Sequence, residues 1–546
     1  MGATLRALRA LVLLSGFYLL SLLLLAVLVG ADVAAFGWGL RGPAAFKLLL
    51  VTAVLAVPVV RGMFMLRTPR GEEPAGIPVT EADEPRLWAL VRDLAAATGT
   101  RAPDRILLTA DVNAAVSEES RFLGLLPGPR RLFLGVPLLT GLTEAQLRGV
   151  LAHEYGHFTG GDTRLSALVV RGRVQIARVI GQFHAKADGK VAAERARQEQ
   201  ASAKRVAKGR KAKRIDTAGA GATYRTMAKI YTAYGKLYLR ASLSTARAQE
   251  YAADLAAARI AGRDATASAL REIPVLAESH EFYLDSYATL GLPARLLPPH
   301  GEFFGGFGRL LTAREEELAK LRAELAAAPV SPYDSHPPIA ERVRRIEELP
   351  SDGRTEEATD AALALLTDPQ RTLAALEDTA LTDEVLAFRR TAEWPELLNA
   401  SMAENLSSAR TPLHEALTDY TGQPATLSAL LDVIDDGRLW RLAERLPLSE
   451  EAAAAKGRAF REFVRPRLQW MLRTMVLAEF SARSLLQWEF SWSREAVVRL
   501  PGWVSENTPD DDPKAALEAA VEAALADHPD TAPLRALLPP TAAQPA

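Results

Sequence analysis

The sequence predicts a mainly α chain: an N-terminal two-helix transmembrane hairpin, an α+β domain with a small sheet, and an all-helical C-terminal domain. Three observations support this. Two apolar stretches open the chain, short β-like runs lie near Arg105 and Gly135, and an Ala/Leu/Glu-rich helical pattern fills the last third. The expected bounds are 1–70, 71–350 and 351–536, followed by a disordered tail at 537–546.

Composition narrows the function classes. The chain has 546 residues, enough for several domains, and its 65 Lys and Arg against 66 Asp and Glu give no overall preference for nucleic acid. It contains no cysteine, which excludes disulfides, thiolate nucleophiles and Cys-ligated metals. A metal site must therefore use His, carboxylate or backbone oxygen.

The first apolar stretch lies between Arg9 and Asp32 and has 22 uncharged residues, about the length needed to cross a bilayer as a helix. The second, Ala44–Leu66, carries Lys47 and Arg61 near its ends, where cationic side chains can reach the headgroups. A signal peptide cut after Ala31 is the alternative for the first stretch, but the run exceeds the usual signal core. We expect a two-span anchor in the lipid bilayer.

Charges beside these stretches predict the orientation. Arg6 and Arg9 precede the first stretch, and Arg61, Arg67 and Arg70 lie at or after the end of the second. The positive-inside rule then predicts a multi-pass protein of the cell membrane with both ends, and the domain that follows, in the cytoplasm.

The middle domain begins with an amphipathic helix over residues 87–99, followed by strands at Arg105–Thr109 and Arg131–Gly135. Residues 186–214 hold eleven Lys or Arg against three acids and precede Gly219-Ala220-Gly221, which predicts a flexible basic insert over 186–221. Its 186–214 part is either a solvated linker or a contact for anionic lipid. Without interleaved aromatic residues it is a poor nucleic-acid site.

The C-terminal domain should begin after Pro350-Ser351-Asp352-Gly353. It holds six of the eight tryptophans, including Trp470, Trp488, Trp492 and Trp503, enough to build a core. A packed helical domain is favoured over a dedicated aromatic binding surface, and the sequence assigns this domain no role.

One motif carries the chemistry. Thr143-Glu144-Ala145-Gln146 predicts a capping box that opens a helix running to Gly160-Gly161, and His153-Glu154-Tyr155-Gly156-His157 lies inside that helix. Histidines four apart present their rings on one face, one turn apart, where both can bind one ion. Glu154 lies about 100° around the helix from His153, near the ion, where a general base would act.

A third ligand must come from elsewhere. The stretch Lys236–Ala261 predicts a helix ending at Gly262, with Arg247, Glu250 and Asp254 on one stripe. Such a pair of acids is often a solvated face, but the alanines between them favour close helix packing.

Several motifs together resemble the HtpX and CAAX prenyl protease family of gluzincin peptidases, over about residues 85–350. They are HEYGH, Gly161-Asp162, the segment Gln249–Asp254, and Ser335-His336-Pro337-Pro338 with Arg342. The resemblance implies a zincin-like fold and one Zn²⁺ per chain, held by His153, His157 and Glu250. It further implies that Asp254 orients a ligating histidine.

The resemblance also associates His336 and Arg342 with the active site, His336 as a donor to the oxyanion or as a structural residue. Asn113, Ala114 and Ala115 resemble the edge segment that accepts a substrate peptide. Family members usually have further spans after the metal helix, but here Ser166–Phe183 is broken by Arg171, Arg173 and Arg178, so a large intramembrane chamber is not expected.

These observations predict a membrane-anchored zinc endopeptidase with Glu154 as general base. Its partner would be a polypeptide substrate, and the resemblance implies membrane or misfolded proteins and a role in membrane-protein quality control. The alternative is a catalytically silent, membrane-tethered regulatory or binding scaffold that retains the metallopeptidase fold.

Overall fold

A computed structural model describes residues 3–64, 75–118, 128–158, 163–206, 215–217, 219–326, 336–351, 353, 360–504 and 512–538. Contacts divide the chain into two units. The first comprises Met1–Ala277 and Ala319–Pro369, and the second comprises Glu278–Leu318 and Gln370–Ala546.

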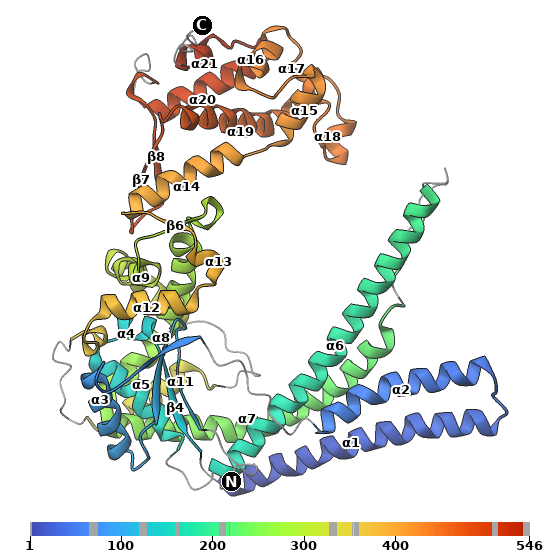
Figure 1. Ribbon diagram of the computed structural model, residues 1–546, viewed down its shortest axis with the longest axis vertical. Helices are drawn as coiled ribbons and strands as arrows, with labels where there is room; N and C mark the ends of the chain where they lie inside the picture. Colours follow the sequence, from blue (N-terminus) through green and yellow to red (C-terminus); the bar gives the residue numbers. More distant parts are fainter. Residues whose placement is uncertain are drawn as a thin grey trace. The chain divides into compact units, whose positions relative to one another are not determined.

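The first unit contains four strands and most of the long helices (Figure 1). The strands are β1 Gly76–Val79, β2 Arg105–Thr109, β3 Ala114–Glu118 and β4 Arg130–Gly135. The helices are α1 Ala3–Gly37, α2 Pro43–Phe64, α3 Pro85–Ala97, α4 Val136–Gly141, α5 Glu144–Gly156, α6 Thr163–Val206, α7 Ala222–Ala261, α8 Arg263–Tyr283, α10 Glu315–Ala326, α11 Ile339–Glu347 and η4 Ala362–Leu365, where α8 and α10 each cross the division between the units.

The four strands form one mixed sheet in the order β1-β2-β4-β3. β2 and β4 are parallel, and their register pairs Ile106 with Leu132 and Leu108 with Leu134. These four side chains are fully buried, which places the core on one face of the sheet. β3 pairs with β4 alone, so it is an edge strand of this sheet. The predicted helix and both predicted strands of this region are confirmed, with shifts of up to two residues at their ends.

One helical segment among the described residues, Ser15–Gly37, is long and apolar enough to cross a membrane. The apolar part of α2, Pro43–Val57, is shorter. Residues 65 and 66 of the predicted second span lie outside the described residues. The first span therefore has a matching helix, and the second span, with the multi-pass topology, stays a prediction.

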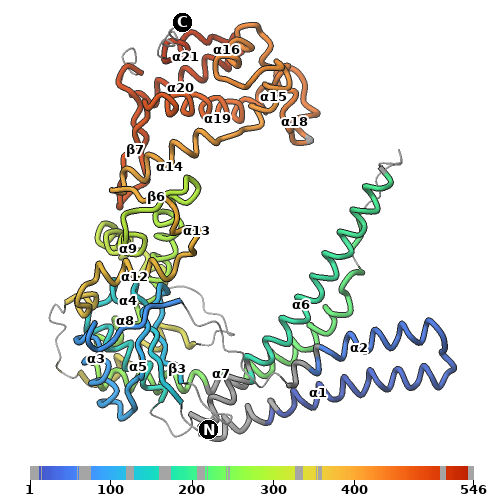
Figure 2. Tube along the Cα trace, in the orientation of Figure 1, coloured from blue at the N-terminus to red at the C-terminus, as the bar shows by residue number. Residues whose placement is uncertain are grey.

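α1 and α2 pack against a hairpin formed by α6 and α7 (Figure 2). Phe17, Leu55, Phe183 and Tyr231 belong to one buried cluster of these four helices. Ser21 Oγ lies 3.0 Å from the hydroxyl of Tyr231 within it. These buried contacts explain how α6 and α7, which are largely polar, pack against the apolar helices α1 and α2.

The basic segment differs from its prediction. α6 continues to Val206, so residues 186–206 are helical rather than flexible chain. Ala, Arg, Glu, Gln and Lys make up most of this stretch and all favour helix, which outweighs the lack of an apolar face. Residues 207–214 lie outside the described residues.

The second unit is mostly helical. Its helices are η2 Leu284–Ala288, η3 Leu292–Ala294, α9 Glu302–Ala313, α12 Pro369–Ala380, α13 Asp383–Leu386, α14 Trp394–Ser408, α15 Pro412–Thr421, α16 Leu427–Asp435, α17 Leu439–Ala443, α18 Glu450–Ala454, α19 Arg458–Ala482, η5 Gly502–Val504, α20 Pro513–Ala524 and α21 Ala532–Leu537. Two small sheets interrupt them: β5 Leu296–Leu297 with β6 Arg389–Arg390, and β7 Gln487–Glu489 with β8 Val497–Arg499. The expectation of an all-helical C-terminal domain was therefore wrong.

The second unit also takes in residues 278–318, which precede the boundary predicted at Pro350. The buried carboxylate of Glu377 accepts hydrogen bonds from the backbone N–H groups of Gly301 and Phe303, at 2.9 and 3.2 Å. These two bonds tie α12 to the start of α9 across more than seventy residues. Composition along the chain gives no sign of such a long-range pairing.

Candidate metal centre

Helix α5 carries the histidine motif, and its N-terminus is fixed by the predicted capping box. Gln146 N–H donates to Thr143 Oγ1 at 3.2 Å, and Thr143 N–H donates to Gln146 Oε1 at 2.9 Å. The helix ends at Gly156, earlier than predicted, and Gly160 and Gly161 lie outside the described residues. His157 keeps a helical backbone conformation at the C-cap, so both histidines follow helical geometry.

Two glycines of α5 allow the neighbouring helices to approach. A Cβ at Gly156 would lie 3.0 Å from Cα of Ala253 in α7, and a Cβ at Gly149 would lie 3.1 Å from Cα of Thr266 in α8. The glycines are seven residues apart, so they share one face of α5. This close approach brings Glu250 up to the two histidines.

His153, His157 and Glu250 form a three-residue cluster whose candidate ligand atoms all lie within 4.8 Å of one another. His153 Nε2 lies 3.6 Å from Glu250 Oε2, and His157 Nε2 lies 3.7 Å from Glu250 Oε1. The two imidazole rings are nearly perpendicular, with centroids 4.8 Å apart. The packing of α5 on α7 thus brings together side chains that are about a hundred residues apart in the sequence.

The donor set fits a zinc ion. Two imidazoles and a carboxylate are the ligands of many catalytic zinc sites, and bonds of about 2.0–2.1 Å place neighbouring ligand atoms of a tetrahedron about 3.4 Å apart. The nitrogen–oxygen separations in the cluster are close to that value. Glu250 Oε2 is buried and faces three nitrogen atoms, His336 Nδ1 at 3.0 Å, Arg342 Nη2 at 3.5 Å and His153 Nε2 at 3.6 Å, so this carboxylate oxygen already lies in surroundings that favour its negative charge.

Asp254 holds one of the histidines of this cluster in place. Its Oδ1 lies 2.9 Å from His153 Nδ1, the ring nitrogen that faces away from Glu250. Arg342 of α11 donates to both oxygens of Asp254, from Nη2 at 2.6 Å and from Nε at 2.8 Å. Asp254 and Arg342 are both buried, so the paired charges hold the orientation of the His153 ring.

Burial and neighbouring charges shift the pKa values of the residues in this cluster. Burial opposes the protonated form of His153, but Asp254 and Glu250 outweigh it and raise the His153 pKa to about 9. Burial and His153 lower the pKa of His157 to about 4. The pKa of Glu250 falls despite its burial because His153, His336 and Arg342 favour the carboxylate. Bound zinc would take the place of the proton on His153.

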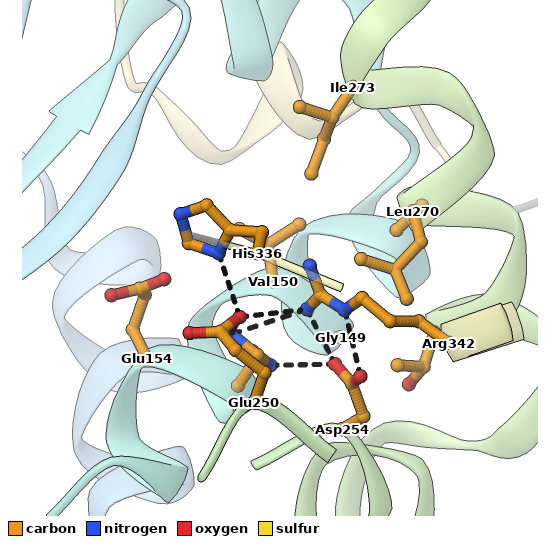
Figure 3. Close-up of a pocket in the computed structure, with 12 residues that line it drawn as sticks. Gly149, Val150, Glu154, Glu250, Asp254, Leu270, Ile273, His336 and Arg342 are labelled. Carbon is orange, nitrogen blue, oxygen red and sulfur yellow. Dashed lines mark hydrogen bonds and ion pairs between the residues drawn. The ribbon is translucent and has the colours of Figure 1, made fainter. Parts of the chain in front are cut away.

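Glu154 and His336 lie on the side of Glu250 that faces away from Asp254 (Figure 3). Burial raises the pKa of Glu154 to about 7, although His153 partly opposes the shift. The ring of His336 is two-thirds exposed, and its Nδ1 lies 3.0 Å from Glu250 Oε2. Both side chains line one pocket with His153, Glu250 and Arg342.

The remaining predicted site residues lie elsewhere. Ala114 and Ala115 begin the edge strand β3, which packs against α5, and Asn113 precedes it. Asn113 receives a backbone hydrogen bond from Gly135 N–H at 2.7 Å. None of these three residues lines the pocket. Gly161, Asp162 and Ser335 of the family motifs lie outside the described residues.

Sequence reasoning missed an apolar part of the same pocket. Val150, Leu270 and Ile273 line it together with Gly149 and Thr266. The sequence could have indicated that Val150 faces the site, because it lies one helical turn before His153 in the same helix. No pattern within α8 indicated that Leu270 and Ile273 face a metal centre.

Residues 81–350 match peptidase family M48. This segment is an M48 peptidase domain. The match covers the motif helix, Glu250, Asp254 and Arg342, and it makes the chain a zinc metallopeptidase, a hydrolase. No solved structure matches the chain.

Proposed function

We propose that the M48 domain is a membrane-anchored endopeptidase in which His153, His157 and Glu250 hold one zinc ion and Glu154 is the general base. The observation that carries the proposal is the meeting of three ligand-type side chains from α5 and α7, two of which, His153 and Glu250, line one pocket with Glu154. A zinc ion so held would polarise the scissile carbonyl and lower the pKa of its bound water to about 7.

Glu154 would take the proton of the attacking water and return it to the leaving amine. Its position next to His153 in α5 places the carboxyl beside the ligands without making it one.

His336 would stabilise the negative charge that develops on the substrate oxygen. Its ring lines the pocket and is two-thirds exposed, and a rotation away from Glu250 would bring it to a substrate oxygen. Asp254 would fix the tautomer of His153, with Arg342 holding Asp254 in turn.

The substrate would bind as an extended strand along β3. Ala114 and Ala115 lie on this edge strand, whose outer backbone groups have no neighbouring strand in the described sheet. Adding a peptide strand there would satisfy those groups by hydrogen bonds. Small side chains at these two positions leave room for the peptide.

The apolar helix Ser15–Gly37 supports membrane anchoring, with the second span completing a cytoplasm-facing hairpin. Proximity to a bilayer suits membrane or misfolded protein substrates, and so a role in membrane-protein quality control. The basic helix 186–206 would then contact anionic lipid if it reaches the headgroups.

The test compares the parent chain with Glu154→Gln and with a matched control, Glu348→Gln, whose side chain is exposed at the end of α11. All three proteins should bind one zinc per chain. The parent and the control should cleave an unstructured protein substrate, whereas Glu154→Gln should not. If Glu154→Gln cleaves at the parent rate, the assignment of the base is wrong. Zinc-loaded parent without any peptidase activity would instead indicate a silent scaffold.

A further inference from the structure

Helix α19 of the second unit packs one face in a core and leaves the opposite face open to solvent. The buried face includes Phe460, Val464, Leu468 and Met471. Phe463 and Trp470 lie on the opposite face, where they are 58% and 52% exposed. Seven residues separate them, so their side chains point to the same side of the helix, two turns apart. Large aromatic side chains gathered on one open face indicate contact with a partner.

Two polar features lie between these aromatic side chains. Arg467 lies one turn after Phe463, and its guanidinium donates to the carbonyl of Pro447. Among the described residues no carboxylate pairs with Arg467, so its charge can meet an acid from a partner. Pro466 lies inside the helix and has no N–H, so the carbonyl of Glu462 lacks its usual helical donor. The face thus offers a cation and a hydrogen-bond acceptor beside its apolar area.

These features favour a polypeptide over the two other partners that could cover the face. Glu462 borders the face with a side chain that is 57% exposed, and an anionic bilayer would repel it. A second copy packed about a twofold axis between Phe463 and Trp470 would bring two Arg467 side chains together, because Arg467 lies near the middle of that stretch. A polypeptide segment supplies apolar side chains, an acid and backbone N–H donors together.

We infer that this face of α19 is a docking site for an unfolded polypeptide segment with apolar and acidic side chains, and that it recruits substrate to the peptidase domain. The inference rests on the proposed function, because the docked polypeptide is the one that the endopeptidase cleaves. Phe463 and Trp470 supply the apolar contact, and Arg467 selects acidic over basic segments. A docking site on the same chain raises the concentration of substrate at the metal centre.

The first test compares long and short substrates of the zinc-loaded full chain. The long substrate is reduced, carboxymethylated α-lactalbumin, an unfolded protein, and the short one is a peptide that spans one of its cleavage sites. Combining Phe463→Gln with Trp470→Gln should raise KM for the long substrate by about tenfold and leave its kcat unchanged, because Gln keeps the helix but removes the apolar contact. Cleavage of the short peptide should not change.

The matched control is Trp503→Gln, which removes an exposed tryptophan of η5 and should behave as the parent does. Equal KM values of the parent and the double variant for the long substrate would overturn the inference. The proposed function would still stand in that case, because the short peptide would be cleaved.

The second test reads binding without turnover, so it decides the inference even if no substrate is cleaved. Labelled carboxymethylated α-lactalbumin is titrated into zinc-loaded Glu154→Gln, and anisotropy gives the affinity. Adding Phe463→Gln and Trp470→Gln should weaken binding by about tenfold. Arg467→Glu should also weaken it, because the carboxymethyl groups make the probe acidic. Affinities that these changes leave unaltered would overturn the inference.

Two further measurements would reveal a different partner on this face. Sedimentation velocity should give the same oligomeric state for the parent and the double variant. Vesicles of brominated phosphatidylglycerol should not quench Trp470, whose emission is the difference between the parent and Trp470→Gln. A change of oligomeric state would assign the face to a second copy, and quenching would assign it to the bilayer, and either result would contradict the docking of a polypeptide.

Discussion

Replacing Asp254 by Asn tests how the buried support of His153 contributes to the metal centre. The change keeps the size of the side chain but removes the charge that pairs with Arg342 at 2.6 and 2.8 Å and faces His153 Nδ1 at 2.9 Å. Asp254 is almost fully buried and Arg342 nearly so, and the buried guanidinium would be left with the longer contact of its Nη2 with Glu250 Oε2, at 3.5 Å. Breaking such a pair from one side costs about 3–5 kcal/mol of unfolding free energy. Loss of a residue that orients a ligand costs about 10–100-fold in metal affinity.

Two measurements follow from this change: zinc affinity by competition with a chromophoric chelator, and unfolding by urea in the zinc-free protein. The matched control is Asp264→Asn, which weakens a partly exposed pair with Arg263 and should cost under about 1 kcal/mol without changing zinc affinity. If Asp254→Asn binds zinc within twofold of the parent and unfolds at the same urea concentration, Asp254 does not support the site as we describe.

Two further changes test the helix packing and the titration of the site. Gly156→Ala places a Cβ 3.0 Å from Ala253 Cα, so it should separate α5 from α7 and weaken zinc binding. Urea unfolding should show a loss of about 1–3 kcal/mol in the free energy of unfolding. The control Gly189→Ala, in open space on α6, should not destabilise the chain. In zinc-free protein, the Glu154 pKa of about 7, raised from 4.5 by burial, means that the folded state holds the extra proton between these values. Stability from this group is then full below about pH 4.5 and is lost as the pH rises through 7, by at most about 3 kcal/mol. Glu154→Gln should remove that loss between pH 5 and pH 8, and an unchanged pH profile would contradict the raised pKa of Glu154.

The local parts of the centre could be predicted because they depend on short-range geometry. The ring spacing of His153 and His157 follows from the helical period, and the capping box at Thr143 follows from two side chains three residues apart. The strand Arg105–Thr109 was also predictable, since a short run of consecutive apolar residues is typical of a buried strand.

Features that depend on long-range packing could not be predicted in this way. The apolar part of the pocket needs α8 to lie against α5, which depends on the close approach of Gly149 to Thr266 across more than a hundred residues. The inclusion of residues 278–318 in the second unit likewise depends on bonds from Glu377 to the start of α9. Residues 186–206 were misjudged because their charge suggested flexible chain, although their side chains favour helix.

The most direct test of the central claim is zinc content together with the zinc X-ray absorption spectrum, for the parent, Glu250→Gln and Glu348→Gln. The account predicts one zinc per chain in the parent and in the Glu348→Gln control, with nitrogen and oxygen neighbours at about 2.0–2.1 Å. Glu250→Gln should lose most of the zinc or change the first-shell oxygen signal. A full zinc content with an unchanged spectrum in Glu250→Gln would contradict the assignment of Glu250 as the third ligand.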